Sequence, residues 1–280
     1  MNKKVKEAAL ILIDIALKDD VGEGDITTNN IVPSEIKRKA KMVAKTDGVI
    51  AGLPVAEMVF RKLDHDLIWN ELTPDGTKVK KGDVLVEFAG SYRALLTGER
   101  TALNFLQRLS GIATMAAIYA DAVKDFQTVI LDTRKTLPGF NKLDKYAVKT
   151  GGASNHRLGL HDMAMIKDNH IEVAGGITAA VKAVRSSVDH GIKIEVETTT
   201  LAQVQEAIDA KADIIMLDNM DLETMRKGVQ LIAGRAKVEA SGNITLERLR
   251  EVAATGVDYI SIGALTHSVS AMDISQRIED

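Results

Sequence analysis

Short apolar runs recur through the second half of the chain and are separated by segments of helical character. Six of these runs begin near residues 128, 163, 192, 213, 236 and 258, and they are rich in Ile and Val. Such alternation predicts parallel strands joined by crossover helices, and units of about 20 to 35 residues are typical of a closed or nearly closed barrel. We therefore predict an α/β fold with a (β/α) barrel of six or seven parallel strands.

The first half of the chain predicts a different kind of domain. Residues 8–17 are apolar except for Asp14, which favours an amphipathic helix over the core of a signal peptide. Residues 36–50 alternate charged and apolar positions, as a half-exposed strand does. A helix follows over residues 54–63, with a proline in its first turn, and residues 74–88 predict two short strands joined by turns.

A long helix is predicted between Arg93 and about Asp125, where leucines recur at spacings of three and four. Gly111 predicts a break in this helix, so we place the domain boundary there. The expected domains are an N-terminal α+β sandwich over residues 1–110 and the β/α barrel over residues 111–280.

The composition excludes several classes of protein. The 280 residues are 45% hydrophobic and carry a formal net charge of -3, with both signs spread along the chain. This spread argues against a nucleic-acid-binding protein. The absence of cysteine excludes disulfides, a thiolate nucleophile and cysteine-ligated zinc, and it fits a cytoplasmic protein. No stretch reaches the roughly 20 apolar residues of a membrane span.

Basic residues follow two of the predicted strands. The first run delivers Arg134 and Lys135 at its carboxyl end, the second delivers Lys167, and His156 and Arg157 lie between them after a Gly-Gly pair. The carboxyl ends of parallel strands share one rim, where α/β folds bind ligands. A single charged residue after a strand is usually a solvated loop residue. Five cations on one rim would repel one another without an anion, so we infer a substrate with several negative charges.

Acidic residues follow the next strands. Alternation along residues 192–197 places Lys193, Glu195 and Glu197 on the face that points into the barrel, where a charge needs a partner or a ligand. We expect a structural ion pair between Lys193 and Glu195, whereas Glu197, nearer the rim, is the better ligand. Asp218 is either a ligand or the N-cap of the next helix.

Two glycine turns follow the last two strands, at Ser241-Gly242-Asn243 and Ile262-Gly263-Ala264. Glycine lets backbone N–H groups at a helix N-terminus approach an anion, which predicts a phosphate site. A turn from strand to helix needs glycine in any case, so a purely structural role stays open.

The ordered motifs of the chain resemble those of the quinolinate phosphoribosyltransferases, also called carboxylating nicotinate-nucleotide pyrophosphorylases. The similarity extends from about Asp19 to the last turn, and so many spaced motifs in one order are a specific signal. The motifs that carry it are Gly98-Glu99-Arg100-Thr101-Ala102-Leu103-Asn104, Thr133-Arg134-Lys135-Thr136, Gly151-Gly152-Ala153-Ser154-Asn155-His156-Arg157, Ile166-Lys167-Asp168-Asn169-His170, Glu195-Val196-Glu197, Leu217-Asp218-Asn219 and Ser241-Gly242-Asn243.

This resemblance implies a pentosyltransferase of NAD biosynthesis, which converts quinolinate and phosphoribosyl pyrophosphate to nicotinate mononucleotide, pyrophosphate and CO2 with Mg2+. It implies catalytic roles for Lys135, Lys167, Glu197 and Asp218, with Mg2+ held by the two carboxylates directly or through water. It also implies a homodimer, or a hexamer of dimers, in which Arg100 reaches the neighbouring subunit's site. The expected substrate-binding residues are Arg100, Thr133, Arg134, Lys135, His156, Arg157, Lys167, Glu197, Asp218, Ser241, Gly242, Asn243, Ile262, Gly263 and Ala264.

Other interpretations stay open. A paralogue on the same fold would use another pyridine acid or a molybdate-linked nucleotide, and a non-catalytic protein would only bind a phosphosugar. Residues 74–88 resemble the hammerhead of a lipoyl or biotinyl carrier, but their lysines lie in a turn without the tight hairpin that a carrier needs. We therefore expect a small scaffold sheet there, no nucleic-acid or membrane partner, and structural roles for His161 and His170.

Overall fold

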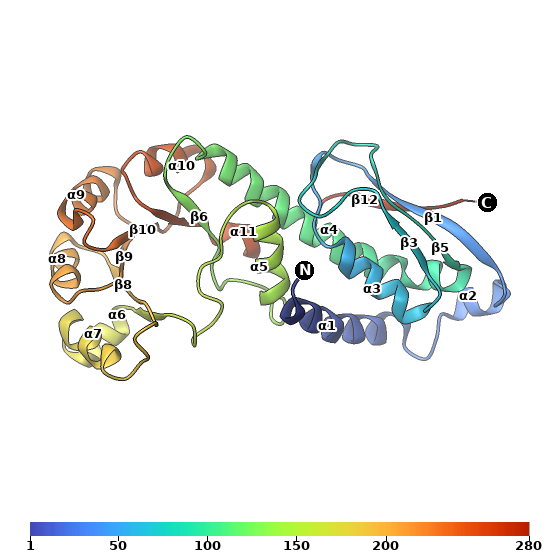
Figure 1. Cartoon of the computed structure of the whole chain (residues 1–280), viewed down its shortest axis with the longest axis horizontal. Coiled ribbons are helices and arrows are strands. Elements are labelled where there is room, and N and C mark those ends of the chain that lie inside the picture. The colour runs from blue at the N-terminus through green and yellow to red at the C-terminus, as the bar shows by residue number, and fades with distance from the viewer. Residues whose placement is uncertain (280) are drawn as a thin grey trace. The chain divides into compact units, whose positions relative to one another are not determined.

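The computed structural model describes residues 1–279 (Figure 1) and divides them into two compact units. Unit 1 contains residues 1–117 and 136–152 and continues from Leu265 onward, and unit 2 contains residues 118–135 and 153–264. The chain therefore passes between the units more often than two consecutive domains would require.

Unit 2 is built on a curved sheet of six parallel strands in the order β6-β11-β10-β9-β8-β7. Each strand starts one or two residues from its predicted apolar run, and Ser154 adds a single parallel bridge beside Leu131 at the edge of β6. The predicted α/β barrel architecture is thus confirmed, with six strands and a minimal seventh. The strands are β6 (Val129–Leu131), β7 (Ala164–Ile166), β8 (Ile194–Thr198), β9 (Ile214–Asp218), β10 (Lys237–Ser241) and β11 (Tyr259–Ser261).

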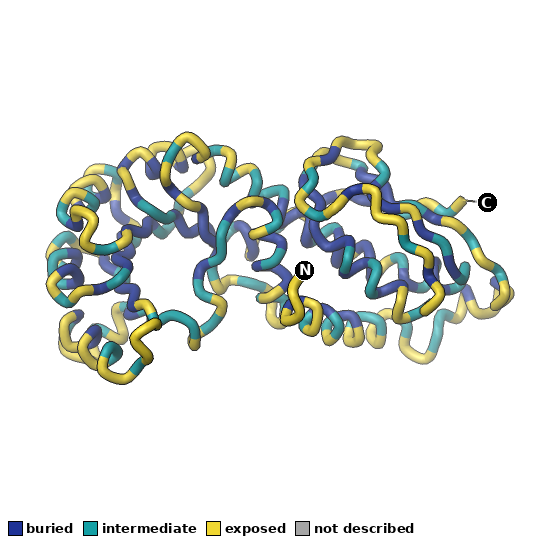
Figure 2. Tube along the Cα trace, viewed as in Figure 1, coloured by how far each residue is buried: buried dark blue, intermediate teal, exposed yellow. Residues whose placement is uncertain are grey.

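Helices line the outer side of this sheet, and Figure 2 shows buried strands inside an exposed helical layer. Each helix turns a narrow apolar face to the strands; α8, for example, buries Val204, Ala207 and Ile208. Because the strands are covered on both faces, β9 is an almost unbroken apolar run. The helices are α6 (Asp168–Ala174), α7 (Ile177–Arg185), α8 (Leu201–Asp209), α9 (Leu222–Ile232) and α10 (Leu246–Ala253). The short α11 (Ala264–His267) follows β11, and all of it but Ala264 belongs to unit 1.

Unit 1 contains an antiparallel sheet in the order β12-β1-β5-β3, with helices packed against it. Phe60, Trp69 and Phe88 form an aromatic cluster in its core, with ring centroids 5.0 to 6.2 Å apart. The predicted N-terminal α+β domain is therefore present. Its elements are α1 (Lys3–Val21), α2 (Ile26–Ile31), β1 (Lys37–Ala44), β2 (Gly48–Val49), α3 (Leu53–Leu63), β3 (Ile68–Glu71), β4 (Lys78–Val79), β5 (Val84–Ser91), α4 (Tyr92–Ala122), α5 (Asn141–Thr150) and β12 (Ile274–Glu279).

Two segments from the second half of the chain belong to unit 1. Strand β12 pairs with β1 over six residue pairs, from Lys39 opposite Glu279 to Ala44 opposite Ile274. Helix α5 is fixed by a bidentate ion pair in which Arg108 donates to the fully buried Asp144 at 3.1 and 2.7 Å. The structural units therefore differ from the expected ranges 1–110 and 111–280, because these pairings connect residues far apart in the sequence.

Gly111 does not break the long helix, which corrects our expectation. Helix α4 continues through it, and a Cβ atom at Gly111 would lie 2.2 Å from the carbonyl oxygen of Ser270. The glycine is needed for the close approach of this later backbone segment rather than for a turn.

The lysine-rich turn of residues 78–81 has the character of a scaffold. Strand β4 pairs with β2, whereas β5 pairs with β1 and β3, so β4 and β5 do not form a hairpin. Lys80 makes an ion pair with Asp47 at 2.8 Å. Among residues 1–279, no helix combines the length and apolar character needed to span a bilayer.

We expect Gly111→Ala to destabilise the protein. Alanine gains about 1 kcal/mol in helix propensity over glycine, but the backbone of Ser270 leaves no room for the methyl group. The net loss should be about 1 to 3 kcal/mol in the free energy of unfolding, measured by urea denaturation. Gly191→Ala is the matched control, since a Cβ there meets nothing within 4 Å. Equal stability of the two variants would contradict the close contact.

Candidate active site

The predicted site residues of unit 2 gather at the carboxyl ends of its strands. Lys167 follows β7, Glu197 lies near the end of β8, and Asp218 and Ser241 are the last residues of β9 and β10. Strands β8, β9 and β10 are neighbours, and Ser241 pairs directly with Asp218 in register. The structure therefore brings these side chains to one rim.

A lysine and a glutamate meet directly on this rim. The Lys167 ammonium donates to the Glu197 carboxylate, and the two side chains are 43% and 18% exposed. Part of the charge of Glu197 is thus balanced within the protein, while both groups remain accessible to a ligand. Lys167 also donates its backbone N–H to Nδ1 of His170 at 3.0 Å, which caps helix α6. This contact supports the structural role expected for His170.

Asp132 anchors the loop that carries His156 and Arg157. This carboxylate is fully buried directly after β6, and it accepts hydrogen bonds from the backbone N–H of His156 and from Nδ2 of Asn155, both at 2.8 Å. The loop is thereby tied to the strand that leads to Arg134. Sequence reasoning missed Asp132; its position at the end of an apolar strand beside a basic run was the available signal.

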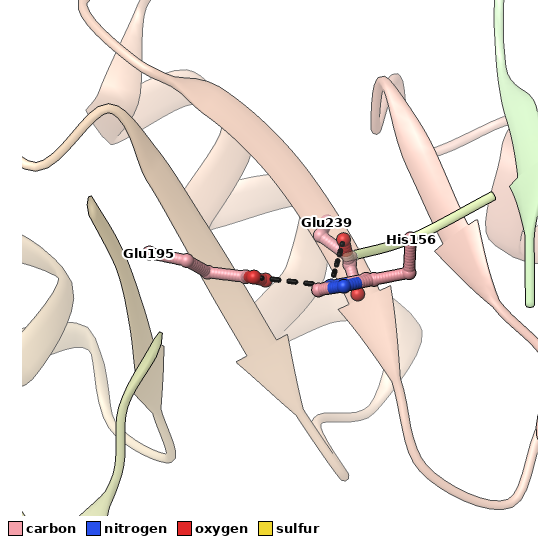
Figure 3. Close-up of side chains that lie close together, drawn as sticks. All are labelled: His156, Glu195 and Glu239. Atoms are coloured by element: carbon pink, nitrogen blue, oxygen red, sulfur yellow. Dashed lines mark ion pairs between the residues drawn. The ribbon is translucent and has the colours of Figure 1, made fainter. Parts of the chain in front are cut away.

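Two buried glutamates converge on the imidazole of His156 (Figure 3). His156 Nε2 lies 3.0 Å from Oε2 of Glu195 on β8 and 3.5 Å from Oε2 of Glu239 on β10. Both glutamates have 0% exposure. We call His156, Glu195 and Glu239 the acid–histidine cluster. The expected pair between Lys193 and Glu195 is wrong, because Glu195 faces His156 instead.

The members of the acid–histidine cluster compete for protons. Burial lowers the pKa of His156, but hydrogen bonds and charges of Glu195 and Glu239 outweigh burial and raise that pKa. Burial, reinforced by the charge of Glu239, also raises the pKa of Glu195. The backbone N–H of Arg157 donates to Nδ1 of His156 at 2.7 Å. A hydrogen on Nδ1 would therefore point directly at this N–H group. Because Nδ1 accepts from this N–H, a ring hydrogen lies on Nε2, which faces the two carboxylates.

Arg134 and Arg157 lie close enough to influence each other. Burial lowers the pKa of the Arg157 guanidinium, and the positive charge of Arg134 lowers it further. Arg157 also donates from Nη1 to the carbonyl of Met163 at 3.2 Å. Guanidinium groups bind carboxylates and phosphates through paired hydrogen bonds, so Arg134 and Arg157 are candidates for holding an anionic ligand.

Asp218 is not a helix cap. The N-cap of α9 is Asp221, whose carboxylate accepts from the N–H of Thr224 at 2.8 Å, and this hydrogen bond lowers the pKa of Asp221. Asp218 instead accepts from Nδ2 of Asn219 at 2.7 Å. The cap interpretation is thus excluded, and the carboxylate of Asp218 is available at the rim.

The two glycine turns differ in structure. At Gly242, where φ is +94°, a Cβ atom would lie 2.2 Å from Oδ1 of Asn219, which also accepts from Nδ2 of Asn243 at 3.1 Å. This turn therefore joins the loops after β9 and β10. At the second turn, Ile262 donates its N–H to the carbonyl of Leu131 at 2.9 Å, and the helix that follows has only four residues. A phosphate site at these turns stays a prediction.

One predicted residue lies outside unit 2. Arg100 is exposed on α4 in unit 1. Unit 1 also has a pocket of its own between α1 and α4, lined by residues that include Asp19, Asp20, Asn104 and Arg108, and no predicted site residue lines it. The site geometry therefore rests on unit 2. Its rim has the chemistry of an enzyme that handles anionic substrates, and the sheet beneath makes that enzyme a β/α barrel.

The chain belongs to the quinolinate phosphoribosyltransferase family. The family's C-terminal domain matches residues 112–277 and its N-terminal domain matches residues 25–110. A probable carboxylating nicotinate-nucleotide pyrophosphorylase of Synechocystis sp. is 46% identical over 265 residues, covering 94% of this chain and 90% of that relative. A chloroplastic one of Oryza sativa is 44% identical over 287 residues, covering 96% and 77%. The solved nicotinate-nucleotide pyrophosphorylase of Francisella tularensis matches with a TM-score of 0.94 at 39% identity, covering 98% and 96%.

We expect Asp221→Ala and Asp218→Ala to separate capping from ligand binding. Loss of the cap in Asp221→Ala should lower the free energy of unfolding by about 1 kcal/mol in urea denaturation. Asp218→Ala should stay within about 0.5 kcal/mol of the wild type, because its carboxylate supports no helix end. A loss in Asp218→Ala as large as that in Asp221→Ala would contradict the assignment.

Proposed function

We propose that this protein transfers the phosphoribosyl group of phosphoribosyl pyrophosphate to quinolinate and releases pyrophosphate and CO2, giving nicotinate mononucleotide for NAD biosynthesis. Membership of the family supports this proposal. The observation that carries it is the rim itself, where Lys167, Glu197 and Asp218 gather at the carboxyl ends of three neighbouring strands, because a dicarboxylate and a phosphorylated sugar need cationic and acidic groups side by side.

Quinolinate would be held mainly by arginine forks. A guanidinium binds a carboxylate through two parallel hydrogen bonds, which suits Arg134 and Arg157. Lys135 is exposed beyond the same strand and would add positive charge, and His156 would border the pocket. We assign Lys167 to the region between this pocket and the pyrophosphate that leaves the sugar.

The sugar donor would lie over the acidic side of the rim. The carbon that is attacked develops positive charge as pyrophosphate departs, so the carboxylates of Glu197 and Asp218 would stabilise it and accept hydrogen bonds from ribose hydroxyls. The 5′-phosphate would meet the turns at Gly242 and Gly263. Oxygen ligands such as these carboxylates fit Mg2+, which would screen the charge of the leaving pyrophosphate. Because Lys167 already contacts Glu197, contact through water fits better there.

Decarboxylation needs no further group on the protein. The ring nitrogen of quinolinate forms the new bond to the sugar carbon and becomes cationic. When the carboxylate beside it leaves as CO2, the electron pair of the broken carbon–carbon bond stays on the ring carbon next to this positive nitrogen, and a proton from solvent then replaces the carboxylate. The protein has only to hold that carboxylate in place.

An assay with Arg134→Ala tests this proposal. Wild-type protein incubated with quinolinate, phosphoribosyl pyrophosphate and Mg2+ should form nicotinate mononucleotide, measured by liquid chromatography with mass detection. Arg134→Ala should lose about 10- to 100-fold in quinolinate affinity by calorimetry, because it loses a charged bidentate contact. Arg226→Ala, on the exposed face of α9, is the matched control. Wild-type protein that forms product from nicotinate but not from quinolinate would refute the proposal.

We also propose that the active form is a homodimer, or a hexamer of dimers, with shared sites. Arg100 is exposed in the single chain, so it is free to reach a neighbouring subunit. The cytoplasmic location expected from composition remains a prediction, since the rice relative is named as chloroplastic.

Mixed dimers test the sharing of sites. Arg100→Ala and Arg157→Ala should each be nearly inactive alone. When the two variants are coexpressed, half of the randomly formed dimers would contain one copy of each. Each of these mixed dimers would hold one intact site out of two, so about a quarter of the wild-type activity should return. Arg134→Ala mixed with Arg157→Ala is the control without recovery, because both residues come from the same unit 2. Absence of recovery in the first mixture would show that each site uses one chain.

A further inference from the structure

The proposed reaction gives no role to Glu195 and Glu239, the two acids of the acid–histidine cluster. We propose that Glu195 and Glu239 are positioning residues, which hold the imidazole of His156 from inside the barrel and, through its other nitrogen, fix the backbone of Arg157. The proposal deepens the proposed function, and its consequence for quinolinate binding rests on that function.

The first step of the argument is the convergence of the two acids. Glu195 and Glu239 lie on β8 and β10, with β9 between them, and both side chains point to the same ring (Figure 3). Within residues 1–279, neither the oxygens of Glu195 nor Nε2 of His156 make a hydrogen bond of regular geometry, so the 3.0 Å approach of Oε2 to Nε2 is the polar contact that joins the two side chains. Two carboxylates buried in an apolar sheet are costly unless a donor meets them. His156 Nε2, at 3.0 and 3.5 Å from the two carboxylates, is the nitrogen placed to meet them.

The second step is the difference between the two acids. Ser261 donates its hydroxyl to Oε1 of Glu239, which orients this carboxylate from β11. Its other oxygen is 3.5 Å from His156 Nε2, against 3.0 Å for Glu195. Glu195 is therefore the principal acceptor, and Glu239 confines the ring from the other side.

The third step leads from the ring to the arginine. With its hydrogen on Nε2, the ring offers Nδ1 as acceptor for the backbone N–H of Arg157 at 2.7 Å. Asp132 holds the backbone N–H of His156 itself. Rotation of the ring away from Glu195 would break the contact at Nδ1 and release Arg157 from one of its fixed points, which would misplace the guanidinium that is assigned to quinolinate.

The kinetics of Glu195→Met and Glu195→Gln test the proposal. Methionine fills the space without an acceptor, so Glu195→Met should raise KM for quinolinate about 10-fold or more. KM for phosphoribosyl pyrophosphate and kcat should stay within about threefold, because the residue acts through His156 and Arg157, which are both assigned to quinolinate. The amide oxygen of glutamine accepts from Nε2, so Glu195→Gln should stay within about threefold for all three constants.

The variant Glu239→Met provides a comparison with Glu195→Met, and the separate effects on KM and kcat distinguish positioning from a loss of folded protein. Glu239→Met should raise KM for quinolinate less than Glu195→Met does, since its carboxylate is farther from the ring. A merely structural role would lower the active fraction, and thus kcat, without changing KM. Unchanged KM in folded Glu195→Met, or an equal rise in Glu195→Gln, would overturn the proposal.

Ring nitrogen chemical shifts of the wild type test the same geometry without catalysis. In protein labelled with 15N-histidine, His156 should show hydrogen on Nε2 and none on Nδ1 at neutral pH, with the signal assigned by its loss in His156→Gln. Hydrogen on Nδ1 would overturn the link to Arg157, even if Glu195→Met does not fold. A stoichiometric divalent metal bound to the acid–histidine cluster in purified protein would also overturn the proposed link to Arg157. If the proposed function itself is wrong, the wild-type protein will be inactive with quinolinate while the nitrogen chemical shifts of His156 still show hydrogen on Nε2.

Discussion

Burial of negative charge inside an apolar sheet is the constraint on which this site depends. Asp132, Glu195 and Glu239 are each 0% exposed; Asp132 directly follows β6, whereas Glu195 and Glu239 lie within β8 and β10. A buried carboxylate requires a hydrogen-bond donor or a proton. The loop of residues 155–157 supplies donors from its backbone, from Asn155 and from the ring of His156. The same contacts that satisfy the acids therefore fix the loop, and the fixed loop presents Arg157 at the rim.

Much of the fold was predictable because the signals are local. Strands covered on both faces become continuous apolar runs, so all six barrel strands could be found from the sequence. The alternation at Glu195 correctly predicted a charge pointing into the barrel. Pairings between distant segments were not predictable: β12 beside β1, Ser154 beside Leu131, and the contact of Gly111 with Ser270, which a local pattern could only interpret as a helix break.

The site was predictable in its composition but less so in its contacts. Charged residues directly after apolar runs identified Lys167, Glu197 and Asp218, because carboxyl ends of parallel strands share one rim. The partner of Glu195 was misassigned, since Lys193 is close in sequence whereas His156 comes from a loop nearly forty residues earlier. Asp218 and Asp221 both precede α9, and the three-dimensional structure is needed to show that the Asp221 carboxylate reaches the helix N–H groups. Order along the chain reveals which groups are near the site, while three-dimensional packing determines their partners.

The pairing of β12 with β1 has a consequence for biosynthesis. Because β1 is translated more than two hundred residues before β12, the ribosome finishes unit 2 while one edge of the unit 1 sheet still lacks its neighbour. An unpaired strand edge is prone to associate with other chains. The nascent protein thus has to protect the edge of β1 throughout elongation. Rapid synthesis, or a ribosome that stalls near the 3′ end of the coding sequence, would leave this edge open to aggregation.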